Sequence, residues 1–357
     1  MLYCFFRLPV FARWHSHITA ICPAGGFFGT VRTLAEYIAF FIGEVMKSNL
    51  IISSSVRSIA QLSRLQGLPL QQKINLSQRR IQQFNIEQRG KVYVSFSGGK
   101  DSTVLLHLVR SMYPNTQAVF LDTGVEYPEI VSFVNKVENV ITLRPKMAFK
   151  KVLETYGFPM VSKEVSQKIY EIQHTNSDKL RNKRLNGDQN GNGKLAEKWK
   201  YLISEDIKIS HNCCNILKKT PAKKYEKESG NHPYIGDMAA ESRLRKTNWL
   251  LNGCNSFKTQ RPTSRPLSFW NETDIWKYIT LNSLEVSDIY KTEARTGCMY
   301  CLFGCQFDDT DGARRFDRMK TTHPKHYAAA EKMGIISALN LIRPVPDSQA
   351  YFYFAET

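Results

Sequence analysis

Val92-Tyr93-Val94-Ser95-Phe96-Ser97-Gly98-Gly99-Lys100-Asp101-Ser102 decides the fold, because a β-rich run enters a paired-glycine turn and then a helix. Two glycines let the backbone approach an anion closely, and the first amides of the helix are donors without intrahelical partners at the positive end of its dipole. The hydroxyls of Ser97 and Ser102 and the ammonium of Lys100 can add to these donors. The stretch therefore predicts a phosphate-binding loop; a chance strand-turn-helix is the alternative.

This loop differs from the common ATPase loop, in which four residues separate a glycine from Gly-Lys-Ser/Thr. Here the lysine follows the paired glycines at once and Asp101 follows the lysine. The anion site is therefore of a different type.

The segments around the loop alternate between apolar runs of strand length and runs with helical spacing. Such alternation predicts an α/β fold with a doubly wound, mostly parallel sheet, in which ligands bind beyond the carboxyl ends of the strands. We expect the C-terminal part to be helical and rich in cysteine. The expected elements are helices within Val56–Gln88, strands at Lys91–Phe96, Ala118–Leu121 and Val140–Leu143, and helices at Ser102–Tyr113, Pro128–Val137 and Met147–Tyr156.

Composition limits the class of protein. The 357 residues include 49 Lys+Arg against 32 Asp+Glu, so the net charge is +17 and we expect an anionic partner or substrate. Hydrophobic residues make up 42% of the chain, which excludes wholesale disorder. Eight cysteines are too few for a disulfide scaffold in a chain this long and indicate metal or redox work in a reducing compartment, the cytoplasm. No apolar stretch is long enough to predict a membrane span.

The chain divides into four predicted parts. Residues 1–45 are expected to be an extension without a role in the fold or an unstructured leader. Residues 46–89 are predicted to be an N-terminal helical segment, 90–245 the nucleotide-binding α/β domain, and 246–357 a helical region with the cysteine cluster. Within the second half of the α/β domain, a basic loop at 176–200 is rich in Asn, Gly, Lys and Arg and is predicted to be mobile. It is either a solvated surface or a groove that faces phosphates.

Three motifs carry a resemblance to a known family. Ser97 to Ser102 resembles the PP-loop of the ATP pyrophosphatase group, which cleaves ATP between its α and β phosphates. The segment from Phe120 to Glu129 is similar to the strand-end motif of the small subunit of sulfate adenylyltransferase and of phosphoadenosine phosphosulfate (PAPS) reductases. Ile235 to Arg245 is similar to the family segment that places a Glu-Ser pair and arginines beside a nucleotide sulfate. The similarity extends from about Gly90 to Asn340.

The resemblance implies roles for individual residues. Lys100, Asp101 and Asp122 are the expected catalytic group, with Lys100 stabilising developing charge on pyrophosphate and Asp122 orienting Mg²⁺ or a ribose hydroxyl. From its position after a strand, Asp122 is alternatively a turn-capping residue. The expected nucleotide-binding residues are Ser95, Ser97, Gly98, Gly99, Ser102, Thr123, Gly124, Glu241, Ser242, Arg243 and Arg245.

The cysteines predict a metal centre. Cys213-Cys214 and the Cys298, Cys301, Cys305 group supply soft thiolates that suit an iron-sulfur cluster or zinc. Successive side chains on a regular helix point in different directions, so one of the vicinal pair with Cys298, Cys301 and Cys305 is one possible set. The adenosine phosphosulfate (APS) reductase branch of the family implies the other set, with a [4Fe-4S] cluster on Cys213, Cys214, Cys298 and Cys301.

Two departures from the reductases bear on the reaction. The family's nucleophilic tail cysteine has no counterpart, because no cysteine follows Cys305, and the phosphate loop is intact where those reductases usually have a degraded one. Both favour ATP cleavage by an adenylating enzyme or sulfurtransferase, with Mg²⁺ and ATP or a sulfated adenosine as cofactors.

The sulfur acceptor is open between a nucleotide, tRNA and DNA, and so is the identity of the electron or sulfur donor. The positive charge tilts the prediction toward a nucleic acid. The alternative function is a nucleotide- and nucleic-acid-binding accessory protein without turnover.

Overall fold

The computed structural model describes residues 57–307 and 314–342. The predicted extension at 1–45 and the C-terminal residues 343–357 lie outside the described residues. The described residues from Ser58 onward belong to one compact unit.

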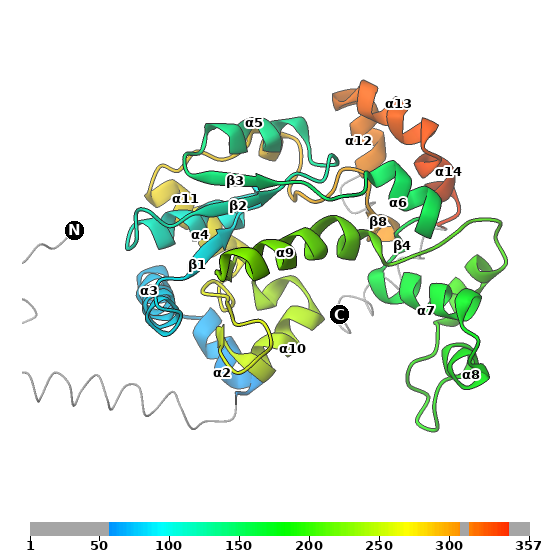
Figure 1. The fold of residues 1–357 in the computed structure, drawn as a ribbon, viewed down its shortest axis with the longest axis horizontal. Helices are drawn as coiled ribbons and strands as arrows, with labels where there is room; N and C mark the ends of the chain where they lie inside the picture. The colour runs from blue at the N-terminus through cyan, green and yellow to red at the C-terminus, as the bar shows by residue number, and fades with distance from the viewer. Residues whose placement is uncertain (1–56, 308–313, 343–357) are drawn as a thin grey trace, which may run out of the picture. The chain divides into compact units, whose positions relative to one another are not determined.

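A six-stranded sheet forms the centre of this unit (Figure 1). Its order is β3-β2-β1-β5-β7-β6, and all neighbouring pairs are parallel except β6 with β7. The strands are β1 (Val92–Ser95), β2 (Ala118–Leu121), β3 (Val140–Leu143), β5 (His232–Ile235), β6 (Asn255–Ser256) and β7 (Thr263–Ser264). The doubly wound, mostly parallel prediction is confirmed.

The order of the strands creates a switch point at β1. The chain adds β2 and β3 on one side of β1 and later returns to add β5 on the other, so Val94 pairs with both Ala118 and Tyr234. Ligands in such sheets bind where the order reverses, beyond the strand ends. Val92, Tyr93 and Val94 are all buried, as expected for a central parallel strand covered on both faces.

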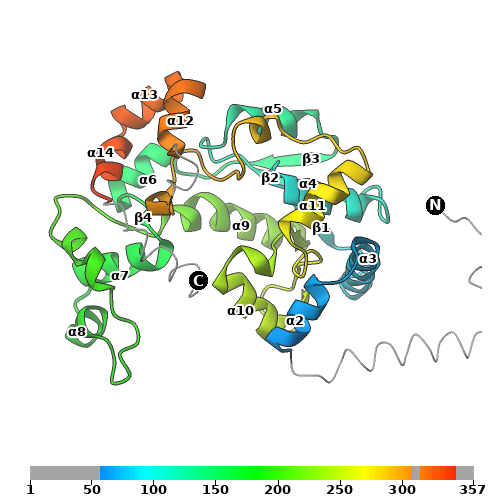
Figure 2. The ribbon, with the colours of Figure 1, turned by 180° about the vertical axis from the view of Figure 1, so that it is seen from behind.

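Helices cover both faces of the sheet. Helix α9 (Thr220–Ser229) crosses in front of it in Figure 1, whereas α4 (Lys100–Arg110) and α11 (Glu272–Leu281) lie in front in Figure 2. Helices α4 and α11 contact each other and both contact α3 (Leu70–Glu87). The remaining helices before β7 are α2 (Ile59–Gln66), α5 (Pro128–Lys136), α6 (Phe149–Tyr156), α7 (Lys163–His174), α8 (Asp178–Asn186) and α10 (Arg243–Asn252). The predicted helices around β1 to β3 are confirmed within a few residues.

The predicted loop at 176–200 needs a correction, because helix α8 occupies much of it. Ser177 caps the helix by accepting a hydrogen bond from the Leu180 amide, Asp178 lies in its first turn, and Lys183 and Arg184 lie in its last turn. These charges complement the helix dipole at both ends. No residue of α8 is buried, so its helicity comes from local capping and charge rather than from an apolar face, and a search for hydrophobic periodicity overlooks it.

The C-terminal part is helical, as predicted, but it shares the central sheet. Strand β7 pairs with β5, and β6 pairs with β7 at the end of the sheet, so residues on both sides of position 245 build one sheet. A second, two-stranded sheet joins β4 (Met160–Val161) to β8 (Leu302–Phe303). The last helices are α12 (Arg315–Thr322), α13 (Pro324–Lys332) and α14 (Ile335–Asn340), and short turns are η1 (Glu197–Ile203), η2 (Asn215–Lys219), η3 (Ala239–Glu241), η4 (Asp288–Lys291) and η5 (Cys305–Phe307).

None of the helices in the described ranges combines the length and the hydropathy that crossing a bilayer requires.

Candidate functional site

The phosphate loop follows β1 at the switch point and leads into α4. Gly98 has φ +72°, and a Cβ placed there would lie 2.7 Å from the Val134 Cγ2 and 2.9 Å from the Ile130 Cγ2. A side chain at this position would be both strained and in collision with α5. Glycine is therefore required here by conformation and by space.

Two serines brace the loop from inside. The Ser102 hydroxyl donates to the Gly99 carbonyl at 2.9 Å, accepts from the Ser97 amide at 3.2 Å and lies 3.1 Å from the Ser97 hydroxyl. Ser97 and Ser102 therefore shape the turn through contacts within it. Ser95 lies at the end of β1 and is half-buried.

Lys100 is placed differently from the sequence prediction of a cation directed at phosphate. Its side chain is only 5% exposed, and its Nζ lies 3.3 Å from the Glu272 Oε1 and 5.4 Å from the centroid of the Tyr290 ring. Its backbone amide donates to the Tyr290 hydroxyl at 2.7 Å. The ammonium of Lys100 therefore contacts Glu272 and its backbone amide contacts Tyr290, because α11 and η4 pack over the start of α4.

Asp101 has a buried carboxyl group. Burial raises the pKa of Asp101 to about 6; Lys100 lowers it, and Glu241 and Glu272 raise it. Its Oδ1 is buried without a hydrogen-bond partner in the described part of the chain, and the Lys100 Nζ is 4.0 Å away. A buried carboxylate oxygen of this kind suits a hard cation such as Mg²⁺.

Asp122 and its neighbours form the next edge of the site, after β2. Asp122 accepts from the Gly124 amide at 3.1 Å and from the Arg144 Nε at 3.0 Å, so it does cap the turn. Thr123 donates through its amide to the buried Glu126 carboxylate at 2.9 Å. The turn is therefore held rigidly by two carboxylates.

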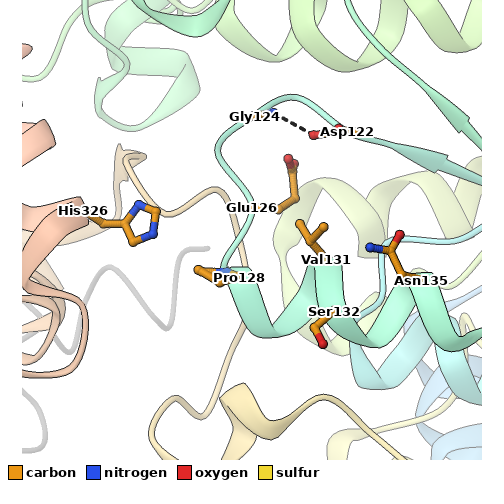
Figure 3. Close-up of a pocket in the computed structure, with 8 residues that line it drawn as sticks. All are labelled: Asp122, Gly124, Glu126, Pro128, Val131, Ser132, Asn135 and His326. Carbon is orange, nitrogen blue, oxygen red and sulfur yellow. Dashed lines mark hydrogen bonds between the residues drawn. The ribbon is translucent and has the colours of Figure 1, made fainter.

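A cavity of about 490 Å³ opens beside this turn (Figure 3). Its walls come from the turn, from residues along the length of α5 and from His326 of α13, whose Nδ1 lies 3.2 Å from the Tyr300 hydroxyl. The cavity lies next to the strand end of β2 and not over the paired glycines, where Tyr290 and Thr296 already contact Gly99. The residues that line it are Asp122, Gly124, Glu126, Pro128, Val131, Ser132, Asn135 and His326.

The segment after β5 lies against the phosphate loop from the other side. A Cβ at Gly236 would lie 3.2 Å from the Asp101 carbonyl oxygen, so the two backbones are close. Glu241 accepts from the Met238 amide at 2.8 Å and pairs with Arg245, which also reaches Asp237 at 3.5 Å. Ser242 caps α10, and Arg243 begins it. The structure thus brings the third predicted motif to the first.

Four of the predicted cysteines lie close together. Burial raises the pKa of the Cys213 thiol, and it is raised further by Cys214, Cys298 and Cys301. Cys213 and Cys214 lead into η2, a π-helical turn, so the helix is not regular there. The expectation that the two side chains point in different directions assumed a regular helix and does not apply. None of the six cysteines in the described ranges is in a disulfide.

Cys305 has a different environment. The Arg315 guanidinium donates to the Cys305 Sγ at 2.7 Å and also to the Cys301 carbonyl. Within the described ranges no three His, Cys, Asp or Glu side chains already stand in a metal-binding arrangement. The four neighbouring thiols fit a thiophilic metal or cluster by their chemistry and proximity, and they would have to draw closer around it.

Lys218, from η2, links the cysteines to the Asp122 turn. Burial lowers the pKa of Lys218, but its interactions with Cys298 and with the Glu126 carboxylate outweigh this and raise that pKa overall. The Lys218 Nζ lies 3.6 Å from the Glu126 Oε1. Sequence reasoning missed Lys218, Glu272, Tyr290 and Thr296; the proximity of Lys218 to Cys214 was the only available signal, since the others reach the loop through tertiary packing.

Comparison with known proteins identifies the family. The family model described as "Phosphoadenosine phosphosulfate reductase domain" matches residues 91–177 and 154–303. An adenosine 5'-phosphosulfate reductase of Bacillus cereus (strain Q1) is 24% identical over 251 residues, 68% of this chain and 86% of the relative. An uncharacterized protein of Methanocaldococcus jannaschii is 26% identical over 223 residues, and the match covers 59% of this chain and 41% of that relative's length.

Two solved structures show weaker similarity. The PAPS reductase of Candida auris in a phosphate complex has 16% identity and a TM-score of 0.36, covering 66% of this chain and 91% of that one. The U34-tRNA thiolase of Methanococcus maripaludis with its [4Fe-4S] cluster has 14% identity and a TM-score of 0.34, covering 75% and 81%.

The family match runs from residue 91 to residue 303, which is more than half of the chain, and it contains the Gly98-Gly99 loop, the Asp122 turn, the Glu241-Ser242 segment and the cysteines at 213, 214, 298 and 301. The protein therefore belongs to the phosphoadenosine phosphosulfate reductase domain family.

Proposed function

We propose that the protein is an enzyme that binds an adenine nucleotide at the Gly98-Gly99 loop and acts in sulfur transfer or sulfonucleotide chemistry. The observation that carries this proposal is the meeting of three features at one edge of the sheet. The Gly98-Gly99 loop contacts Tyr290 and Thr296. In the Asp122 turn, the Val125 carbonyl accepts a hydrogen bond from the Met299 amide at 2.7 Å. Cys298 and Cys301 lie in the same stretch of chain, residues 290–301. A nucleotide at the loop would therefore lie beside the thiols.

In this proposal the loop amides and the N-terminus of α4 bind the phosphates. Arg245, now paired with Glu241 and Asp237, supplies a guanidinium for the nucleotide's outer phosphate or sulfate oxygens. Asp101 and Asp122 offer carboxylate oxygens to Mg²⁺, which would offset the phosphate charge. Thr123 and Gly124 hold the Asp122 turn in place.

For the metal centre we propose Cys213, Cys214, Cys298 and Cys301 as ligands. These four thiols lie close enough for the others to raise the pKa of Cys213, and for Cys214 and Cys298 to raise that of Cys301. A bound [4Fe-4S] cluster would supply redox or sulfur-handling chemistry beside the nucleotide, and zinc is the alternative occupant. Lys218 would balance thiolate charge, and Arg315 would hold the Cys305 loop.

The reaction class that the chain supports best is cleavage of ATP with release of pyrophosphate, in an adenylating enzyme or sulfurtransferase. The support for this reaction class is the intact loop Ser97-Gly98-Gly99-Lys100-Asp101-Ser102, whose glycines and hydroxyls suit the phosphates of ATP. For the sulfur acceptor we propose that it is anionic, such as tRNA or DNA, because the protein has a net charge of +17.

Pyrophosphate release tests the enzymatic proposal. The full-length protein, purified without oxygen, is incubated with MgATP, sulfide and candidate acceptors, and we expect pyrophosphate from the wild type. Lys100→Ala should reduce release at least about 100-fold, since charge stabilisation by a single group is worth about that much. Lys151→Ala, at an exposed surface pair with Glu154, is the matched control and should keep full activity. ATP binding without pyrophosphate under every sulfur source and acceptor would favour the accessory-protein alternative.

Iron, sulfide and zinc analysis with an absorption spectrum tests the metal proposal separately. We expect iron and sulfide in equal amounts and their loss in Cys298→Ser, while Cys254→Ser, outside the cluster, keeps them. A colourless protein that contains zinc would replace the cluster with the alternative metal.

A further inference from the structure

The hydroxyls of Tyr290 and Thr296 cover the start of α4. The Lys100 amide donates to the Tyr290 hydroxyl at 2.7 Å, and the two hydroxyl oxygens lie 3.1 Å apart. A Cβ at Gly99 would lie 3.0 Å from the Thr296 Oγ1 and 3.1 Å from the Tyr290 hydroxyl. We call this pair of hydroxyls the tyrosine cap.

The cap takes the donor that a bound anion would use. An amide at the N-terminus of an 11-residue helix has no intrahelical partner, which is why such amides bind phosphate oxygens. Here the phenol oxygen of Tyr290 fills that role. A phosphate oxygen and the Tyr290 oxygen cannot both accept from the Lys100 amide with good geometry at the same point.

The Lys100 ammonium shows the same pattern independently. It lies 3.3 Å from the Glu272 carboxylate and faces the rings of Tyr290 and Trp276, at 5.4 and 6.0 Å from their centroids. The Trp276 and Tyr290 rings meet edge to face at 5.6 Å. The backbone amide and the ammonium of Lys100, two separate donors of the loop, therefore both have partners within residues 272–296.

The cap continues directly into the cysteine region. Thr296 is two residues before Cys298 and five before Cys301, and the Met299 amide between them donates to the Val125 carbonyl of the Asp122 turn. Glu293, buried, holds this stretch to α12 through two hydrogen bonds from Arg318, at 2.9 and 2.7 Å. Tyr290 therefore belongs to a segment that is attached to its surroundings at Glu293, between the two cap residues, and at Met299, after them.

We propose that the tyrosine cap is a gate on the phosphate loop: nucleotide phosphate displaces Tyr290 from the Lys100 amide, and the displacement reaches Cys298 and Cys301 along residues 290–301. The inference rests on the proposed nucleotide site and adds a residue that couples this site to the thiols. Tyr290 is a positioning residue in this account, because it acts through the loop and the segment that it joins.

The first test compares MgATP binding by full-length wild type and Tyr290→Phe, measured by calorimetry. The variant keeps the ring packing against Trp276 and loses only the hydroxyl that competes with phosphate. We expect it to bind MgATP about 2- to 10-fold more tightly, the equivalent of one net hydrogen bond. Glu272→Gln, which releases the Lys100 ammonium, should also bind more tightly. Tyr327→Phe on α13 and Glu285→Gln on the exposed surface are the matched controls and should bind as the wild type does.

The second test follows amide hydrogen exchange in peptides from residues 288–301 by mass spectrometry. MgATP should increase exchange there in the wild type, and Tyr290→Phe should show the increased exchange before nucleotide is added. Inorganic pyrophosphate is the smaller probe and should have the same effect if the phosphates alone displace the cap.

The outcomes separate the inference from the proposed function. Binding by the wild type together with equal or weaker binding by Tyr290→Phe overturns the gate and leaves the nucleotide site in place. Binding with unchanged exchange at 288–301 also overturns it. An absence of MgATP and pyrophosphate binding by both proteins overturns the proposed function, and the gate with it.

Discussion

Two constraints act on the single residue Gly98. Its φ is left-handed, and a Cβ at this position would collide with two methyl groups of α5. We expect Gly98→Ala to cost about 1–3 kcal/mol of unfolding free energy, the range for strained backbone, and to weaken MgATP binding at least about tenfold. Urea unfolding and calorimetry measure the two effects. Gly67→Ala is the control, because its φ is −82° and its Cβ would make ordinary contact 3.5 Å from the Ser63 oxygen. Equal behaviour of the two variants would refute the steric account.

Asp101 gives a pH-dependent prediction at the same scale. Its pKa is about 6 in the folded protein against an ordinary value of 3.8, so the folded state binds the proton more tightly than the unfolded state does. The stability contribution of this group is therefore highest below about pH 4, falls as the pH rises to about 6, and is constant above that. The total fall is on the order of 2–3 kcal/mol.

The measurement compares urea unfolding of the wild type and Asp101→Asn from pH 4 to pH 8, without magnesium. We expect the difference in unfolding free energy between the two proteins to change over pH 4–6, with the wild type losing stability relative to the variant. A difference that is flat across this window would show that Asp101 has an ordinary pKa.

At the scale of elements, the π-helical turn η2 decides how the vicinal cysteines meet their partners. A π-turn contains one residue more than an α-helical turn would, and deletion of the exposed Asn215 should restore α-helical spacing. Cys213 and Cys214 would then rotate by about 100° relative to α9. We expect the deletion variant to fold, by circular dichroism, and to lose most of its bound metal.

Asn215→Ala is the matched control for this deletion, because it changes the same exposed position without changing the helical register. It should keep the wild-type metal content. Full metal binding by the deletion variant would mean that the turn has no part in placing the cysteines.

The helix α8 is another element whose role depends on charge. It has no buried residue, and Lys179 on it is exposed. If the basic region at 176–200 contacts a nucleic acid, Lys179→Glu should remove about one phosphate contact. The slope of log affinity against log salt concentration should then become shallower by about 1. Lys325→Glu, exposed on α13, changes the same charge elsewhere and should leave that dependence unaltered.

For the whole molecule, the net charge of +17 predicts strongly salt-dependent retention of nucleic acid. We expect the affinity for labelled tRNA or DNA to fall by roughly 1000-fold between about 50 and 200 mM salt if six phosphates are contacted. Fluorescence anisotropy measures this fall. Salt-independent affinity, or no retention at low salt, would remove nucleic acid as the proposed acceptor.

Much of the fold follows from local patterns. The apolar runs at β1, β2 and β3 and the helices between them were predictable because strand burial and helical spacing leave a periodic record in the sequence. The cysteine groups were visible as clusters for the same local reason. Strands β6 and β7 have two residues each and α8 lacks an apolar face, so neither left a recognisable pattern.

The sequence by itself determined the paired-glycine turn between a strand and a helix and predicted that it binds phosphate, since glycine conformation and helix-end amides are properties of adjacent residues. It also predicted which thiols are candidate metal ligands. Only the tertiary structure decided that Lys100 pairs with Glu272, that Tyr290 caps the loop and that Lys218 joins Glu126 to Cys298. These contacts join residues about 80 to 190 positions apart, and their geometry is set by how α11, η4 and η2 pack at the carboxyl ends of the strands.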